Sequence, residues 1–343
     1  MAAPPPFSTV LFERIPEFAR IVRAFALGGE ADTMSDLVEF FGAHPYTATI
    51  LFSLSVTVVF LPLALGAAWL FDDPKARENL DFSRISTLTQ KGNRSKIVLC
   101  DLGQNPKHPF PNASPFVLKL DAALRDCGVS FETKSVPFES LPSSNRKIPV
   151  VHWNGKVYSD SQLILDLFVK EGVIETHPDV WLDAQARAKA KMFRLGIENM
   201  AYYGLTRERW LDQWSKSRAI FWPTDASNFI FLHVFAPLFV KPAVKATLKA
   251  VGVLSYSAET WDNVMESFWE DAAVILGNKR YFFGDEQLCS ADYAAFGYLC
   301  NVLAFESMNP KLYKVVSKHE NLVKFVACVT KKLYPEAAVS QKN

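Results

Sequence analysis

Pro149 stands at the head of what otherwise reads as a buried strand, in the run "RKIPVVHWNGKVYSDSQLILDLF" (146–168). Proline has no amide hydrogen to donate to a sheet, so it is confined to strand starts, edges and bulges. The dipeptide Asn154-Gly155 that follows is the strongest short signal for a β-hairpin. The sequence therefore predicts a hairpin over residues 150–159 that begins directly after a proline, with a helix after it.

Further strand and helix patterns surround this hairpin. The runs "KIVLCDL" (96–102) and "SFETKSV" (130–136) have the length and residue types of strands. Between them, "SPFVLKLDAALRDCG" places apolar residues on one helical face and ends at a glycine. The order is β-α-β, a hairpin, then α, with the helix after residue 136 short or degenerate. Beyond about residue 180 the patterns are helical as far as Tyr334, so the predicted class is α+β.

Charge and cysteine content exclude two kinds of site. The 37 Lys and Arg residues nearly balance the 36 Asp and Glu residues, so no global basic field would attract nucleic acid. The 5 cysteines form no C-x-x-C motif and no zinc-like pairing with the 6 histidines. We therefore expect no metal site, and free buried thiols in a reducing compartment.

Residues 46–71 carry no charge and are long enough to cross a bilayer, which takes about 20 apolar residues in a helix. Pro62 would kink such a helix without preventing it. The run begins too late and is too long for a cleaved signal peptide. We expect a single transmembrane helix, and a buried core helix is the alternative. The segment before it (1–45) contains an amphipathic pattern.

The charges that flank this run predict its orientation. Residues 26–45 contain no Lys or Arg, whereas residues 72–91 contain four, namely Lys75, Arg77, Arg84 and Lys91. Because Lys and Arg near a membrane helix tend to stay on the cytosolic side, the C-terminal part should face the cytosol. The polar segment 72–95 is then a linker.

The order of elements, with a proline heading the first hairpin strand, resembles the thioredoxin-like domain of glutathione transferases. The resemblance implies that the Ile148-Pro149 bond is cis and that the backbone there binds glutathione. It also implies that Asp160 and Ser161 hold the γ-glutamyl group at a helix start, where N–H groups and the helix dipole favour a carboxylate. An alternative for the same residues is a capping box, Ser159-x-x-Gln162.

Longer motifs resemble the failed-axon-connections branch, a metaxin-like group of the glutathione S-transferase superfamily. They are "NASPFVLKLDAAL" after a proline-rich loop, "KIPVVHWNGKVYSDSQLI", "YFFGDEQLCSADYAAFGYLCNVL" and "NLVKFVACVTKKLYP". The implied domains are a thioredoxin-like domain (96–175) and a helical domain (180–336). One departure concerns the family's buried capping box, because Cys289 stands where Ser or Thr usually precedes Asp292 by three residues. Either Ser290 caps the helix instead or the box is weakened.

Catalysis in that family needs a donor that stabilises the glutathione thiolate near the first helix. The segment 103–115 contains no tyrosine or cysteine, so Ser114 is the best placed candidate, ahead of Asn112 and His108. Ser114-Pro115 is also typical of a helix start, with serine as N-cap. Tyr202 and Tyr203 lie on the helix that lines the second-substrate pocket in the family, or belong to the core.

Two functions follow from the resemblance. One is a membrane-anchored protein that binds glutathione and conjugates or detoxifies a second substrate. The other is a non-catalytic, metaxin-like scaffold for mitochondrial import or docking. The expected partners are glutathione and a lipid bilayer, with a homodimer or a membrane-protein partner left open. The expected membrane is the mitochondrial outer membrane or the endoplasmic reticulum.

Overall fold

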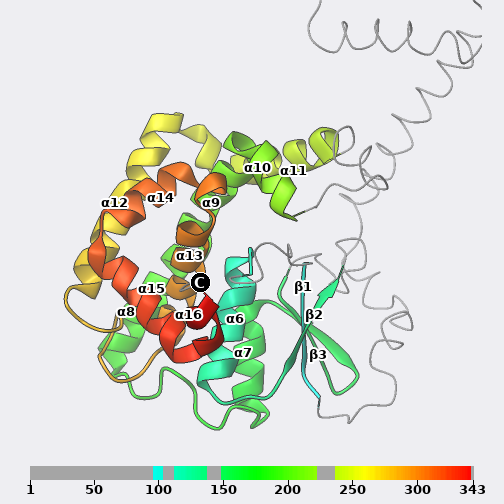
Figure 1. The fold of residues 1–343 in the computed structure, drawn as a ribbon, viewed down its shortest axis with the longest axis vertical. Helices are drawn as coiled ribbons and strands as arrows, with labels where there is room; N and C mark the ends of the chain where they lie inside the picture. The colour runs from blue at the N-terminus through cyan, green and yellow to red at the C-terminus, as the bar shows by residue number, and fades with distance from the viewer. Residues whose placement is uncertain (1–95, 103–111, 137–147, 222–235, 341–343) are drawn as a thin grey trace, which may run out of the picture. The chain divides into compact units, whose positions relative to one another are not determined.

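The computed structural model describes residues 96–102, 112–136, 148–221 and 236–340 (Figure 1). Outside them lie the predicted N-terminal segment (1–45), membrane helix (46–71) and linker (72–95), and the region of the short or degenerate helix after residue 136. Within the four described stretches, no helix is both long and apolar enough to span a bilayer.

The first part of the described chain is a four-stranded sheet with two helices. Its elements are β1 (Val98–Leu102), α6 (Pro115–Asp126), β2 (Glu132–Val136), β3 (Val150–Trp153), β4 (Lys156–Ser159) and α7 (Ser161–Lys170). The strand order is β2-β1-β3-β4, with β1 parallel to β2 and the other neighbours antiparallel. Asn154 (φ 50°) and Gly155 (φ 73°) form the hairpin turn, because both adopt the positive φ that a two-residue hairpin needs. The predicted order of strands and helices is confirmed.

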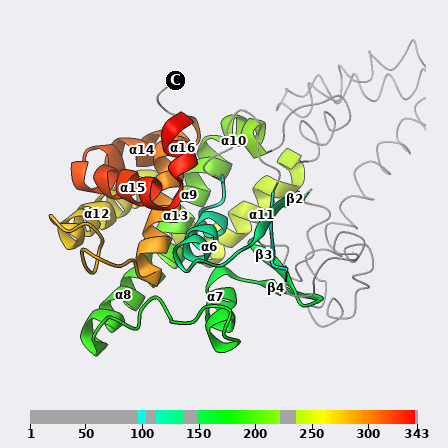
Figure 2. The same ribbon diagram turned by 60° about the horizontal axis from the view of Figure 1, so that its bottom comes forward.

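The two faces of the sheet have different neighbours because side chains alternate along a strand. Leu99 and Val151 are paired across β1 and β3, are fully buried, and pack in the core with α6 and α7. Cys100 and Val150 form a separate small cluster with Val98 and other partly buried residues. Both views place α6 and α7 between the sheet and the later helices (Figures 1 and 2). The sheet is thus attached to the rest of the molecule through these two helices.

The second part is helical. Its elements are α8 (Ala184–Gly196), η2 (Ile197–Ala201), α9 (Tyr202–Arg207), η3 (Glu208–Asp212), α10 (Trp214–Phe221), α11 (Ala236–Ala250), η5 (Val253–Ser255), α12 (Ala258–Leu276), α13 (Ser290–Ala304), η6 (Glu306–Met308), α14 (Pro310–Ser317), α15 (Glu320–Leu333) and α16 (Pro335–Ser340). Residues 184–212 run on as one helical rod that contains two π-helical turns, η2 and η3. α13 is buried on all sides, as expected of a helix that is apolar all round, and it packs against α6.

The structure at the start of α13 shows which residue caps this helix in place of the usual Ser or Thr. Cys289 is the N-cap residue, and its N–H donates to Asp292 Oδ2 at 2.9 Å. Ser290 does not replace it, since its N–H donates to Asp179 Oδ1 at 2.7 Å and its hydroxyl donates to Asp179 Oδ2. Asp292 Oδ1 also accepts from the N–H of Phe282 at 2.8 Å. The aspartate half of the box therefore persists with a cysteine in the cap position.

Candidate functional site

A cavity of about 580 Å³ opens where the starts of α6 and α7 face the rod that begins with α8. It is lined by the main site candidates from the sequence, namely Ser114, Ile148, Pro149, Asp160, Ser161, Tyr202 and Tyr203. Of the two weaker candidates, Asn112 is buried beside the cavity without lining it, and His108 lies outside the described residues. Segments far apart in the sequence thus meet at one site.

Pro149 lies on one side of this cavity, directly before β3. The Ile148-Pro149 peptide bond is cis, as the resemblance implies. β3 begins at the next residue, so the missing proline N–H falls just outside the ladder in which Cys100 is paired with Val150. This position explains how a proline can head a buried strand.

Asp160 forms the N-terminal cap of α7. Its Oδ1 accepts hydrogen bonds from the N–H groups of Gln162 (2.9 Å) and Leu163 (3.1 Å). The alternative of a Ser159-x-x-Gln162 capping box is wrong, because the cap is Asp160 and the Gln162 side chain bonds elsewhere. Asp160 has φ 77°, a left-handed conformation that is uncommon outside glycine and often marks a functional turn. Ser161 follows it and is buried.

Ser114 also lines the cavity and forms the N-terminal cap of α6. Its Oγ accepts from the N–H of Val117 at 3.4 Å, and its own N–H donates to Asn112 Oδ1 at 2.9 Å. Pro115 occupies the first helical position, where its missing N–H has no helical partner to lose. A serine hydroxyl has one donor and two acceptor sites, so a cap of this kind leaves the hydroxyl proton able to reach a ligand.

Sequence reasoning missed a buried charge cluster at the wall of the cavity, in which Arg194 and Glu198 line the cavity and Lys119 lies behind them. Lys119 is fully buried, and its Nζ lies 2.6 Å from Glu198 Oε1 and 2.9 Å from Gln162 Oε1. Arg194 Nη1 donates to the other oxygen of Glu198 at 2.7 Å. Burial lowers the pKa of the Lys119 ammonium, and the Glu198 carboxylate opposes that effect. The sequence did contain a signal, because Lys119 lies three residues after Phe116 and therefore falls on the apolar face of α6.

Arg209 is the second group that sequence reasoning missed, and it is 3 % exposed. Its Nη1 donates to the carbonyl oxygen of Ala113 at 2.7 Å. Its Nε donates to Asn309 Oδ1 at 2.6 Å, and its Nη2 donates to Asn301 Oδ1 at 3.1 Å. Burial lowers the pKa of Arg209 to about 10, so the guanidinium is still charged at neutral pH. Nothing in the sequence pattern distinguishes this arginine from a surface one.

Aromatic side chains form the remaining wall of the cavity. The rings of Phe116 and Tyr202 meet edge to face with centroids 4.7 Å apart, and Tyr203 lies 5.5 Å from Tyr202. Trp210 and Phe221 form another pair at 5.0 Å. Burial raises the pKa of the Tyr202 hydroxyl, so this group stays protonated at neutral pH and is not a base. The wall is suited to an apolar or aromatic ligand.

The cysteines take no part in this site. None of the five lines the cavity, and none of them forms a disulfide. Burial raises the pKa of Cys127 to about 11 and that of Cys300 to about 12, so both stay protonated at neutral pH. Within the described part of the chain, no group of three or more His, Cys, Asp or Glu side chains is arranged to hold a metal ion.

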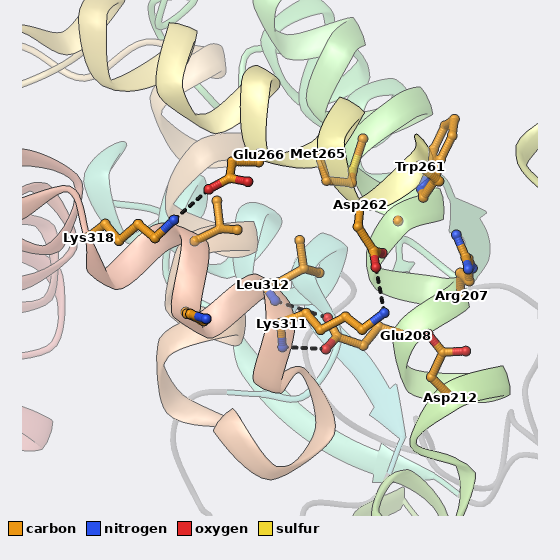
Figure 3. Close-up of a pocket in the computed structure, with 13 residues that line it drawn as sticks. Arg207, Glu208, Asp212, Trp261, Asp262, Met265, Glu266, Lys311, Leu312 and Lys318 are labelled. Atoms are coloured by element: carbon orange, nitrogen blue, oxygen red, sulfur yellow. Dashed lines mark hydrogen bonds and ion pairs between the residues drawn. The ribbon is translucent and has the colours of Figure 1, made fainter. Parts of the chain in front are cut away.

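A second, smaller groove of about 200 Å³ lies between α9, η3, α12 and α14 (Figure 3). Its charges are largely paired: Lys311 Nζ lies 2.5 Å from Asp262 Oδ2, and Lys318 Nζ lies 2.5 Å from Glu266 Oε1. Glu208 accepts from the N–H groups of Lys311 (2.6 Å) and Leu312 (3.2 Å) and so caps α14. None of the predicted site residues line this groove. Its polar groups hold α14 in place.

Comparisons with known proteins point to glutathione S-transferases. A sequence model of the glutathione S-transferase N-terminal domain matches residues 115–214, and one of the glutathione S-transferase C-terminal domain matches residues 270–329. Failed axon connections of Drosophila melanogaster is 25% identical over 243 residues, which cover 66% of this chain and 56% of the fly protein. The match therefore spans little more than half of that relative.

Solved structures with a similar course of the chain are glutathione S-transferases. One from Ceriporiopsis subvermispora, in complex with glutathione, aligns with a TM-score of 0.47 and 17% identity over 69% of this chain and 97% of its own. An epsilon-class enzyme from the housefly Musca domestica aligns with a TM-score of 0.37 and 16% identity, over 69% of this chain and 98% of its own.

Proposed function

The chain belongs to the glutathione S-transferase superfamily, in the metaxin-like branch with failed axon connections, and on that premise we propose that the cavity beside Pro149 binds glutathione. The observation that carries this proposal is the meeting of Pro149, the α7 cap at Asp160 and the α6 cap at Ser114 in one cavity. These groups come from three separate segments. A purely structural role for each cap does not require that they face a common space.

The start of α7 offers the chemistry that a γ-glutamyl group needs. Both backbone bonds to Asp160 use Oδ1, which leaves Oδ2 available for the ligand ammonium. The ligand α-carboxylate would lie at the helix N-terminus beside Ser161, where the helix dipole favours a negative charge. The backbone at Ile148 would hold the middle of the peptide. The ammonium and the α-carboxylate of the γ-glutamyl group would then be held by two adjacent residues, Asp160 and Ser161.

The cysteinyl thiol would lie toward Ser114, whose hydroxyl proton is the candidate donor to a thiolate. A hydroxyl that is also engaged as a helix cap is less free to turn toward the ligand. We therefore propose weak conjugation of apolar electrophiles against the wall formed by Phe116 and Tyr202. Retained binding with weak turnover fits the absence of a tyrosine or cysteine from segment 103–115.

The same cap supports a second candidate, a non-catalytic scaffold of the metaxin type. If the Ser114 hydroxyl serves only α6, through its bond to Val117, the cavity would bind a ligand without activating it. In that case glutathione would stabilise the fold or act as a signal for docking. Measured turnover separates the two candidates.

We also propose that the glutathione-binding part is anchored in a membrane by residues 46–71 and faces the cytosol. The support is the charge-free run and the excess of Lys and Arg after it. Cytosol is rich in reduced glutathione and keeps thiols reduced, which suits five cysteines that form no disulfide. The mitochondrial outer membrane and the endoplasmic reticulum both satisfy this orientation.

Retention on glutathione-agarose tests the binding proposal. The detergent-solubilised full chain should be retained and should elute with free glutathione, whereas Asp160→Ala should flow through. Asp183→Ala is the matched control, because Asp183 caps α8 through a 2.7 Å bond from the N–H of Ala186 and does not line the cavity. Equal retention of the two variants, or no retention of the wild type, would contradict the proposal.

A further inference from the structure

We propose that Arg209 lowers the pKa of the bound glutathione thiol, through its positive charge and by fixing the segment that carries Ser114. This inference rests on the proposed function, since it concerns the same cavity. Arg209 belongs to the helical domain and is, on this proposal, a positioning residue for the thiol chemistry at the start of α6. Within the part of the chain that the structure describes, no other charged side chain lining the cavity both lacks an ion pair and bonds to that segment.

Two side chains of the helical domain hold residues 112–114 in place. Arg209 Nη1 donates to the carbonyl oxygen of Ala113, and Asn301 Nδ2 donates to the carbonyl oxygen of Asn112 at 2.9 Å. The residue that follows these two carbonyls is Ser114. Because the guanidinium occupies the Ala113 oxygen, that carbonyl presents less negative charge to a thiolate beside Ser114.

The positive and negative charges around the cavity do not balance. Among the described residues, the charged groups that line it or lie directly behind it are Lys119, Asp160, Arg194, Glu198 and Arg209. Glu198 pairs with both Lys119 and Arg194. With Asp160 counted, two anions face three cations, and the Tyr202 hydroxyl, whose pKa is raised by burial, is neutral. One positive charge remains, and Arg209 is the cation that bonds only neutral groups.

The local backbone turns Arg209 toward the cavity. Glu208 and Arg209 are consecutive buried residues in the π-helical turn η3, a type of turn that is frequent at functional sites. The Glu208 carboxylate faces the other side, where it caps α14 at the N–H groups of Lys311 and Leu312 (Figure 3). Among the described residues, no carboxylate forms an ion pair with Arg209. The Glu208 carboxylate attracts the Arg209 charge from a distance and offsets part of it, and the rest of that charge acts on the cavity.

The fold also supplies a matched control. Arg207 lies two residues earlier in the same rod and is similarly buried, but it lines the smaller groove (Figure 3). Its Nη1 makes a long bond of 3.5 Å to the carbonyl oxygen of Ala258. Arg207→Gln therefore removes the same formal charge from the same helical segment without touching the glutathione cavity.

The experiment measures the pKa of the bound thiol from the ultraviolet absorbance of the thiolate as pH is raised. The samples are the full chain in detergent with saturating glutathione, and Arg209→Gln, Arg209→Lys and Arg207→Gln. An opposite charge nearby typically lowers an acid's pKa by 1 to 3 units, so Arg209→Gln should raise the thiol pKa by about 1 unit or more. Arg209→Lys should keep most of the lowered value because it keeps the charge. Arg207→Gln should match the wild type.

Asn309→Asp covers the case in which Arg209→Gln does not fold. It places a carboxylate beside Nε while the guanidinium keeps its bond to Ala113, so it too should raise the thiol pKa. Binding of S-methyl glutathione, measured by calorimetry, reports recognition without the thiol. If that analogue binds the wild type but the thiol pKa equals that of free glutathione, or is unchanged in the folded variants, the inference is overturned and the proposed function stands. If the analogue does not bind the wild type, both fall.

Discussion

Gly297 in α13 lies so close to Pro115 in α6 that a side chain has no room between them. A Cβ atom at Gly297 would be 2.3 Å from the carbonyl oxygen of Pro115 and 3.0 Å from the backbone nitrogen of Lys119. The contacting atoms belong to the helix backbone and cannot turn away. This contact joins the helical domain to the helix that begins at Ser114.

Gly297→Ala should therefore destabilise the protein although alanine is the better helix former. Overpacking of a well-filled core costs about 1 to 3 kcal/mol, which exceeds the gain of about 1 kcal/mol in helix propensity. Gly196→Ala is the control, because its Cβ would meet a movable ring atom of Phe268 at 3.1 Å. Urea denaturation should show a clear loss of unfolding free energy for Gly297→Ala and little change for Gly196→Ala. Equal effects would contradict the close-packing argument.

The buried carboxyl of Asp292 predicts a dependence of stability on pH. Burial raises its pKa from an ordinary value of 3.8 to about 6, so between these values the folded state binds the proton more tightly than the unfolded chain does. The contribution of Asp292 to the free energy of unfolding should then fall as pH rises from about 4 to about 6. A comparison of the denaturation of the wild type with that of Asp292→Asn across this pH range isolates the contribution of Asp292. The wild-type advantage should shrink as pH rises, and growth of that advantage would contradict the assignment.

Turnover, if it occurs, should depend on Ser114 rather than on a cysteine. Ser114→Gly removes the hydroxyl at a helix-capping cost of only a few tenths of a kcal/mol, whereas Ser114→Thr keeps it. A hydrogen bond to a charged group contributes about 1.5 to 3 kcal/mol, so Ser114→Gly should slow aryl-halide conjugation by about ten- to a hundredfold. A folded variant without the five cysteines should keep the activity. Loss of activity in that variant, with full activity in Ser114→Gly, would refute the assignment.

The membrane orientation has a reporter in the sequence, Asn93-Arg94-Ser95, an N-x-Ser acceptor for glycosylation. Such sites are modified only on the lumenal side of the secretory pathway, so Asn93 should stay unmodified if the linker is cytosolic. Expression with microsomes, with and without an endoglycosidase, gives the answer as a change in gel mobility. A shift that Asn93→Gln abolishes would place the domain in the lumen and refute a cytosolic glutathione site.

The sequence was sufficient to predict the sheet, the hairpin and the helical second domain, because each depends on local patterns. Asn154-Gly155 required a tight turn, and the apolar spacing from Phe116 onward required a helix that buries one face. Ser114 was predictable as a candidate because Ser114-Pro115 is typical of a helix start, whereas Asp160 came from the resemblance to glutathione transferases. The choice of Ser159 as part of a capping box was wrong because the turn brings Asp160 into the cap position instead.

The buried charges could not be predicted, because they depend on which helices meet. Lys119 is paired with Glu198, 79 positions later, and Arg209 contacts Ala113 from a different domain. A pattern within one helix contains no information about such partners. The π-helical turn that directs Arg209 into the cavity is likewise a product of packing rather than of propensity.

Calorimetric titration of glutathione into the full chain tests the central claim most directly. The wild type should bind one glutathione saturably, and Asp160→Ala should weaken binding by about ten- to a hundredfold, since a charged hydrogen-bond partner contributes about 1.5 to 3 kcal/mol. Asp183→Ala should bind like the wild type. Absence of binding to the folded wild type at millimolar glutathione would contradict the account.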